Sequence, residues 1–410
     1  MDAGDPTAST LQPSNSTEIA QFIREHIRAN GPVPFPWFME QALYHPKFGY
    51  YASGRAEIGR QGDYFTNVSV GPLFGRLLAT QFFEIWRKLG KTDNFAIVEQ
   101  GAHHAEFAAD VLGSIRASFP DFFSTLHYCI IEPFAVLRDR QAQKLAEFGD
   151  KIEWRDSVES LEPFVGIHFS NELLDALPVH LIVSQCGRDL SVATKSEWLE
   201  KRVALDDGRF VFVEQPIVDP ALKAQVKKVE AASCRLRAET RQDAASFPAL
   251  EINLAALDWI DNLSTKLTEG FVLTIDYGFP RAEFYAADRT SGTLQIRSQH
   301  CSLDSPFAAI GHSDITAHVE WTSIAERAEA CGLRLAGFTD QHHFLTGLIS
   351  EVADFFEKAD AKTKRALQTL LHPEMLGRSF QVLALARNVD AMIDLSGFKF
   401  ARNARAALGL

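Results

Sequence analysis

Two carboxylates stand where predicted strands end, and their spacing is the first sign of chemistry. Glu99 follows the apolar run Phe95–Val98, and Glu132 closes the next apolar run along the chain. Strands that alternate with helices form a parallel sheet whose carboxyl ends share one edge. An acid at the second strand end can accept both hydroxyls of a ribose, so the pair predicts an adenosine-bearing ligand. Taken alone, each acid could equally be a solvated strand end.

The turn after the first strand, Gly101-Ala-His-His-Ala105, is the expected contact for the rest of that ligand. Gly101 lets the backbone turn close to a ligand. A helical pattern starts at Glu106, and the free N–H groups of a helix start favour a carboxylate or phosphate. No Gly-Lys-Ser/Thr follows, which excludes a P-loop, and the single glycine excludes a dinucleotide fingerprint.

Two later strand ends carry further polar residues that should face the same crevice. One is Asn171-Glu-Leu-Leu-Asp175 and the other is Asp276-Tyr-Gly278. Carboxylates such as Glu172 and Asp175 could align a cationic or hydroxyl nucleophile there. They could instead cap the following helix.

Histidine and cysteine spacing predicts no metal site. The histidines form a loose set without His-x-x-x-His or Glu-x-x-His pairs on a predicted helix. The five cysteines form no Cys-x-x-Cys pair and indicate reduced thiols in a cytosolic protein.

The elements that must position these residues alternate in type, as expected for an α/β fold. The predicted strands are Phe95–Glu99, His127–Glu132, Ile152–Arg155, Gly166–Ser170, Phe271–Asp276, Leu335–Asp340 and Ser379–Arg387, the last two as a closing βαβ-like pair. The predicted helices are 16–29, 37–44, 71–89, 106–119, 135–148, 220–239, 253–266, 322–331 and a late helical stretch within 347–371.

The alternation breaks at about residue 180, where short β-like runs (181–184 and 209–214) are joined by polar turns, and this suggests an insertion. We divide the chain into a disordered lead-in (1–15), a helical N-terminal cap (16–92), a first core part (93–179), an inserted region (180–250) and a second core part (251–410). A length of 410 residues suits a core with such additions.

Charge and hydropathy narrow the partners and the compartment. The formal net charge is −12, which argues against nucleic-acid binding. No apolar run approaches the roughly 20 residues that cross a bilayer, so no membrane is expected. The acidic first residues resemble neither a signal nor a transit peptide, and we predict a cytoplasmic protein.

Several motifs together resemble the MidA family of S-adenosylmethionine (SAM)-dependent methyltransferases, which includes a mitochondrial arginine methyltransferase. They are Phe38–Tyr51, Gly62–Thr66 with Pro72–Gly75, Asn171–Pro178, Asp276–Gly278 and Gly311–Val319, in family order. The resemblance implies an α/β, Rossmann-like class I methyltransferase sheet of seven mostly parallel strands. A helical N-terminal cap and an inserted substrate region would complete it.

The resemblance also implies roles by position. Those for SAM fall on Gly62, Asp63, Thr66, Glu99, Gly101, His103, Glu132 and Asn171, with Glu132 on the ribose and Glu99 and Gly101 beside the methionine. Glu172 and Asp175 would orient a protein arginine. For a hydroxyl acceptor, the candidate base would be Asp276 or His318, which lies in a late motif with Asp314 and Thr316.

Two departures from the family pattern leave the activity open. His103 and Ala105 replace glycines, and Thr66-Asn-Val-Ser69 lacks the family's acid. His103 could obstruct the amino-acid end of SAM or could hydrogen-bond its carboxylate. The chain is thus predicted to be a methyltransferase with a protein or small-molecule acceptor. The alternative is an impaired descendant that serves as a binding or assembly factor. Self-association into a homodimer is left open.

Overall fold

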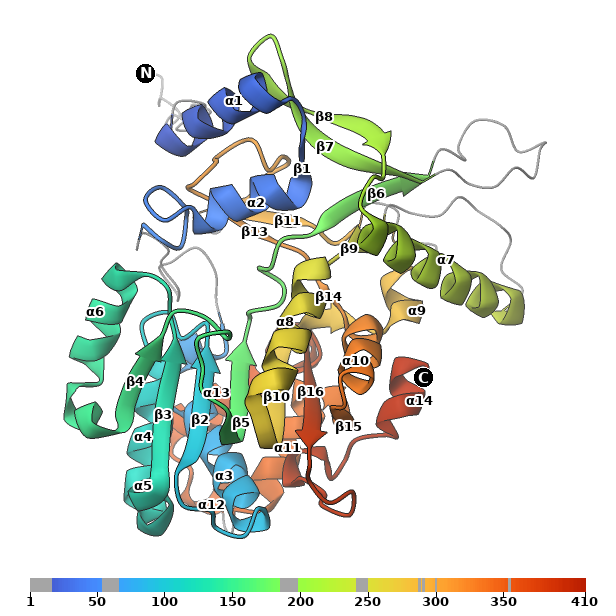
Figure 1. Cartoon of the computed structure of the whole chain (residues 1–410). Coiled ribbons are helices and arrows are strands. Elements are labelled where there is room, and N and C mark those ends of the chain that lie inside the picture. The colour runs from blue at the N-terminus through green and yellow to red at the C-terminus, as the bar shows by residue number, and fades with distance from the viewer. Residues whose placement is uncertain are drawn as a thin grey trace, which may run out of the picture.

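The computed structural model describes residues 17–53, 66–184, 198–240, 250–286, 289, 292–298, 301–352 and 355–410, with backbone alone for 233–240 and 356. Figure 1 shows two parts, a large sheet covered by helices and a smaller sheet above it that carries the N-terminal helices. No helix within these ranges is both long and apolar enough to cross a membrane.

The large sheet has the order β15-β16-β10-β5-β2-β3-β4, and the two-residue β14 (Val319–Glu320) pairs in parallel with the end of β10. Its strands are β2 (Phe95–Gln100), β3 (Leu126–Ile131), β4 (Ile152–Arg155), β5 (Phe164–Asn171), β10 (Leu267–Phe279), β15 (Arg334–Asp340) and β16 (Phe380–Arg387). Neighbouring strands are parallel except at β16, which is antiparallel to both β10 and β15. The predicted class I α/β sheet is therefore confirmed.

One detail of the predicted sheet is wrong. The last two strands do not form a βαβ-like pair, because β15 and β16 lie side by side and antiparallel. Apolar patterning identifies a strand but carries no information on its direction, which depends on where the intervening helices pack.

Helices bury both faces of the large sheet, since side chains alternate between faces along each strand. Ile97 points to one hydrophobic cluster and Val98 to the opposite one. The first face is covered by α3 (Leu73–Lys88), α4 (Glu106–Ser118), α5 (Pro120–Thr125), α11 (Gln341–Ser350) and α13 (Ala361–Leu371). The second is covered by α8 (Leu254–Lys266), α10 (Trp321–Ala330) and α14 (Ala404–Leu408).

The remaining helices of the large part are shorter or peripheral. They are α6 (Ala135–Lys144), α9 (Arg281–Phe284), α12 (Phe355–Lys358) and the single turns η1 (Val68–Val70), η2 (Ala146–Lys151), η3 (Pro373–Gly377) and η4 (Ser396–Phe398). The predicted helix 135–148 thus ends earlier, and η2 continues it toward β4.

The smaller sheet is antiparallel and comes mostly from the predicted insertion. It contains β1 (Val33–Pro34), β6 (His180–Ser184), β7 (Trp198–Asp206), β8 (Arg209–Pro216) and β9 (Leu250–Ile252), with α7 (Pro220–Thr240) on one side. A second small sheet joins β11 (Gln295–Ser298), β12 (Cys301–Ser302) and β13 (Asp314–Thr316). The expected short strands at 181–184 and 209–214 are present; β7 was not predicted.

The N-terminal helices α1 (Glu18–Asn30) and α2 (Phe35–Tyr44) pack on this inserted sheet (Figure 1). Thr17 caps α1 by accepting a hydrogen bond from the N–H of Ala20. Phe35 and Phe38 are fully buried in one cluster with Val203 and Phe210 of the insertion. The domain boundaries stay a prediction, but this packing joins the first helices to residues far along the chain.

A pair of glycines lets the three central strands lie close together. Gly166 on β5 pairs with Ala96 on β2 and with Gly270 on β10. A β-carbon at Gly166 would collide with the carbonyl oxygen of Ala96, and one at Gly270 with the carbonyl oxygen of Gly166. Both have positive φ, 147° and 134°.

We therefore expect Gly166→Ala to lower the free energy of unfolding by roughly 3 kcal/mol or more, because a backbone carbonyl cannot move aside as a side chain can. Gly113→Ala in α4 is the matched control. Its β-carbon would meet nothing within 4 Å, and it should stabilise the helix by up to about 1 kcal/mol. Urea unfolding of both variants tests this, and equal stability would contradict it.

Candidate functional site

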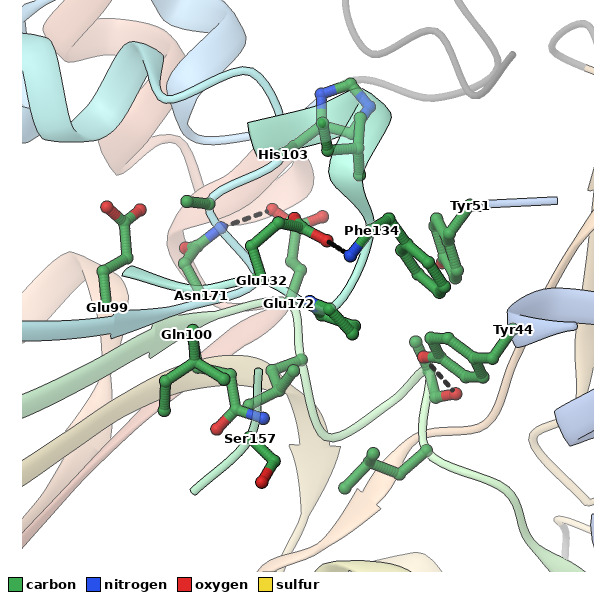
Figure 2. A pocket seen from close by; sticks show the side chains of 18 of the residues that line it. Tyr44, Tyr51, Glu99, Gln100, His103, Glu132, Phe134, Ser157, Asn171 and Glu172 are labelled. Carbon is green, nitrogen blue, oxygen red and sulfur yellow. Dashed lines mark hydrogen bonds between the residues drawn. The ribbon is translucent and has the colours of Figure 1, made fainter. Parts of the chain in front are cut away.

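A cavity of about 720 Å³ lies at the carboxyl edge of the large sheet. Residues that follow β2, β3, β4 and β5 form its floor, and Tyr44, Tyr51, Thr66, Val68 and Ser69 come from N-terminal segments. Figure 2 shows side chains from the four strand ends and the two tyrosines around one space, with Glu132 and Phe134 between Gln100 and the tyrosines. The predicted convergence of strand ends is therefore present.

The turn after β2 keeps a glycine-type backbone although only its first residue is glycine. Gly101, His103 and Ala105 have φ of 82°, 46° and 61°. The N–H of Ala105 donates to the carbonyl of Ala102 at 2.7 Å, which closes the turn just before α4. A β-carbon in left-handed backbone costs roughly 1–2 kcal/mol. The fold thus tolerates strain at the two replaced glycines and retains the loop shape.

The His103 side chain does not block the middle of the cavity. Figure 2 draws its ring at the border of the group of side chains, beyond Glu132 and Phe134. The rings of His103 and His104 lie 3.8 Å apart, and the carbonyl of His103 accepts a hydrogen bond from Gln141 at 2.8 Å.

Glu132, just after β3, is buried and held on both oxygens. Its Oε1 accepts from the N–H of Phe134 at 3.0 Å and its Oε2 from Nε2 of Gln141 at 3.1 Å. Burial raises the pKa of this carboxyl to about 7 despite those bonds. Because a carboxylate offers about four acceptor positions, two remain for a ligand that donates a pair of hydroxyls.

Glu99 at the end of β2 is also buried. The hydroxyl of Tyr128 donates to its Oε2 at 2.7 Å, and burial raises the pKa of Glu99 to about 7. One carboxylate oxygen is thereby oriented, and the residue lines the cavity beside Gly101.

Glu172 follows β5 in a strained left-handed backbone, with φ of 55°. The amide of Asn171 donates to its Oε1 at 2.8 Å, and its side chain lines the cavity. Burial and the nearby Asp276 charge raise the pKa of Glu172 to about 8. Strain of this kind gathers at functional sites.

Asp276 on β10 holds the turn that carries Glu172. Its Oδ2 accepts from the N–H groups of Leu173, Leu174 and Asp175 at 3.1, 2.7 and 3.2 Å, and its Oδ1 accepts from Tyr277 at 2.8 Å. These four bonds occupy the carboxylate. Asp276 therefore shapes the site and is no free base, contrary to the role that a hydroxyl acceptor would have required.

The structure gathers most of the predicted site residues. Thr66, Glu99, Gly101, His103, Glu132, Asn171 and Glu172 line the cavity. Asp175 lies behind the wall; its side chain is buried, and its pKa is raised well above the usual range by burial and by Asp276. Gly62 and Asp63 fall outside the described residues. The roles of all these residues stay predictions.

His318 is the predicted site residue that the structure places elsewhere. It lines a separate space of about 20 Å³ beside Glu251 and Tyr285. Its ring lies 5.3 Å from that of Phe279, its Nε2 is 3.2 Å from the amide nitrogen of Gln295, and its Nδ1 has no partner among the described residues. Burial lowers the pKa of His318 to about 4. The late motif instead reaches the site through Asp314, which accepts from the Tyr51 hydroxyl at 2.6 Å.

Several cavity residues were not found from the sequence. Tyr44 and Tyr51 have rings 5.3 Å apart, and the Tyr44 hydroxyl donates to the carbonyl of Ala176 at 3.0 Å. Trp259 of α8 donates to Gln100 Oε1 at 2.8 Å, and Asp156–Val158 follow β4. The strand-end argument already applied to β4 and could have found Asp156–Val158. Tyr44 and Tyr51 lie in the Phe38–Tyr51 motif, which carried the family resemblance but gave neither residue a role in the site. Trp259 lies in a helix outside the strand ends, where no local pattern marks it.

Metal ligation finds no support in this part of the chain: the described residues hold no group of three or more His, Cys, Asp or Glu side chains arranged around an ion.

The raised pKa of Glu172 predicts a pH-dependent stability. A carboxyl whose folded pKa exceeds its unfolded value stabilises the fold fully below the unfolded pKa, and that contribution disappears as the pH rises from about 4.5 through about 8. Glu172→Gln removes the titration. The free energy of unfolding of the variant, relative to that of the wild type, should therefore rise by at least about 1 kcal/mol when the pH is raised from about 5 to about 8.5.

Chemical denaturation at the two pH values measures this gain in the ligand-free protein. Glu162→Gln, the same change on an exposed side chain, should show no such trend. A Glu172→Gln variant whose stability parallels wild type across that range would disprove the raised pKa.

Curated proteins from several organisms are similar to this chain over most of its length. Over 94% of the chain and 89% of the relative, it is 25% identical to the mitochondrial protein arginine methyltransferase NDUFAF7 homolog of Drosophila melanogaster. It is 24% identical to the human protein arginine methyltransferase NDUFAF7, also mitochondrial, over 95% of the chain and 87% of the relative. The prediction of a cytoplasmic protein is wrong by this comparison, because these relatives are named as mitochondrial.

A solved structure agrees over its whole length. The crystal structure of a COG1565 superfamily member from Burkholderia thailandensis, bound to S-adenosyl-homocysteine, has a TM-score of 0.80 and 28% identity and covers 99% of this chain and 100% of its own. A family model described as "Putative S-adenosyl-L-methionine-dependent methyltransferase" matches residues 77–339, more than half of the chain. Given this match and a sheet with a strand-end cavity, the chain belongs to that family and is a SAM-dependent methyltransferase, as its motifs predicted.

Proposed function

We propose that this enzyme methylates the guanidinium group of a protein arginine and that SAM occupies the 720 Å³ cavity. The observation that carries the proposal is the position of Glu172. Its half-buried carboxyl lines the cavity wall, in front of the buried carboxyls of Asp175, Asp276 and Asp314. Such a group of acids favours a cation. The relatives named as protein arginine methyltransferases support the same acceptor.

The residues present fit SAM. The left-handed turn from Gly101 to Ala105 leaves room beside Glu99 for an amino-acid moiety, and a β-carbon at Gly101 would itself meet only the Leu173 side chain. Glu132 has two acceptor positions left for a ribose, and Phe134 and Asp156–Val158 line the same cavity. Thr66 and Asn171 border the side toward Glu172.

The bound cofactor would supply an electrophilic methyl group on a sulfonium. The chain's own residues must then position the acceptor and receive a proton. A guanidinium nitrogen that gains a methyl group must release a proton. Glu172 can accept a hydrogen bond from an N–H of the guanidinium and take that proton on the oxygen that Asn171 does not hold, since its pKa of about 8 lies near neutral pH. Tyr44 and Tyr51 line the same cavity as Glu172.

A non-catalytic descendant is not favoured. That alternative depended on the loss of two loop glycines and of the family's acid near Thr66. The backbone at His103 and Ala105 nevertheless has the left-handed form that glycines would provide. His318 has no part in the proposed reaction because it does not line the cavity.

The cofactor site is tested by titrating the protein with S-adenosyl-homocysteine in a calorimeter. Glu132→Gln should weaken binding by roughly tenfold or more, because hydrogen bonds to a charged group contribute about 1.5–3 kcal/mol each. Glu153→Gln, on the exposed side of neighbouring β4, should leave affinity unchanged. Wild-type binding too weak to measure would contradict the proposed site.

The acceptor is tested with a peptide that contains arginine and its lysine counterpart, using mass spectrometry to detect methylation. We expect transfer to arginine, and a fall in kcat of roughly 10²-fold or more in Glu172→Gln, since a positioned proton acceptor contributes about that factor. Equal transfer by Glu172→Gln, or transfer to lysine in preference to arginine, would refute the proposed acceptor chemistry.

A further inference from the structure

Three side-chain amides form a hydrogen-bonded chain that ends on Glu172. Gln341 Nε2 donates to Asn67 Oδ1 at 2.8 Å, Asn67 Nδ2 donates to Asn171 Oδ1 at 2.9 Å, and Asn171 Nδ2 donates to Glu172 Oε1 at 2.8 Å. All three bonds point the same way, toward the carboxyl. The members come from the start of α11, the segment before η1 and the end of β5.

The direction of this chain is determined at both ends. Besides Asn67, Gln341 Nε2 faces the carbonyls of Leu370 and Leu376 at 3.2 and 3.4 Å, and carbonyls can only accept. At the other end, Oε1 of Glu172 accepts. A reversed amide at any link would set acceptor against acceptor. Aligned amides also polarise one another and strengthen the last bond.

Burial shows that the arrangement is costly to keep. Asn67 and Gln341 are both fully buried, and Gln341 Oε1 is an acceptor without a partner among the residues described. A buried unpaired acceptor is unfavourable, so its presence in a native protein calls for an explanation. Glu172, which receives the last bond, has the strained backbone noted above.

We infer that Gln341 and Asn67 are positioning residues for methyl transfer: through Asn171 they fix Oε1 of Glu172 and leave Oε2 directed to the acceptor. This inference rests on the proposed function for its kinetic consequence. Neither amide needs to touch the substrate, and Gln341 does not line the cavity. It also explains why Asn67 is compatible with a working site although the family's acid is missing nearby.

The test replaces Gln341, two amides away from Glu172, by methionine. Methionine has a similar length but lacks the amide that donates to Asn67. We expect kcat for the arginine peptide to fall roughly tenfold or more, as small misplacements of a reacting group do. The KM for the peptide and the affinity for S-adenosyl-homocysteine should barely change. Gln81→Met is the matched control. Gln81 is equally buried and hydrogen-bonded to Glu84 and Gly397, with no link to Glu172.

A double-mutant cycle shows whether the effect passes through Glu172. The kcat loss caused by Gln341→Met should largely vanish in a Glu172→Gln background. In the ligand-free protein, the shifts in urea midpoint of the two variants should be non-additive. If Gln341→Met does not fold, Asn67→Leu takes its place in both measurements.

The inference is overturned if Gln81→Met lowers kcat as much as Gln341→Met, since general loosening would then account for the loss. Additive effects in both cycles would overturn it as well. If the wild-type enzyme transfers no methyl group to arginine, the proposed function fails, and the urea cycle alone then decides on the amide chain.

Discussion

The site depends first on the cost of burying carboxyl groups at one edge of a parallel sheet. Glu99, Glu132, Asp175 and Asp276 are at most 6% exposed, and each needs donors inside the protein. Asp276 shows how the cost is met, because three successive backbone N–H groups and its own neighbour's N–H surround its carboxylate. The same bonds hold the turn after β5. The donors that offset the desolvation of Asp276 therefore also determine the shape of the site.

Glu99 and Glu132 are hydrogen-bonded by different side chains. Tyr128 orients Glu99, whereas Gln141 joins Glu132 to the carbonyl of His103 and so ties the second strand end to the altered turn. Trp154 in turn donates to Gln141 at 2.9 Å. The altered turn is therefore supported from outside by a side chain on α6, which helps to explain why it keeps its form without its second and third glycines.

The smaller part of the molecule contributes side chains to the wall of the cavity. Tyr44 ends α2 and Tyr51 lies in the turn after it, yet both face the cavity of the large sheet. They reach it because α1 and α2 pack on the inserted sheet, with Phe35 and Phe38 against Val203 and Phe210. Hydrogen bonds from Tyr44 to Ala176 and from Tyr51 to Asp314 then connect the two parts at the site. Residues of both parts therefore line the cavity and are hydrogen-bonded to each other beside it.

The sequence by itself determined the seven long strands of the large sheet, the order of the strand-end acids and the family, because apolar patterning and motif spacing are local properties. Glu99, Glu132 and Glu172 could be placed at one edge from the rule that parallel strands share a carboxyl end. Only the tertiary structure decided which polar groups meet across long separations. His318 faces another space, Tyr44 and Tyr51 enter the cavity, and Gln341 reaches Glu172 through Asn67. These outcomes depend on how helices and sheets pack, and on which buried donors remain for each acceptor, which no short stretch of sequence encodes.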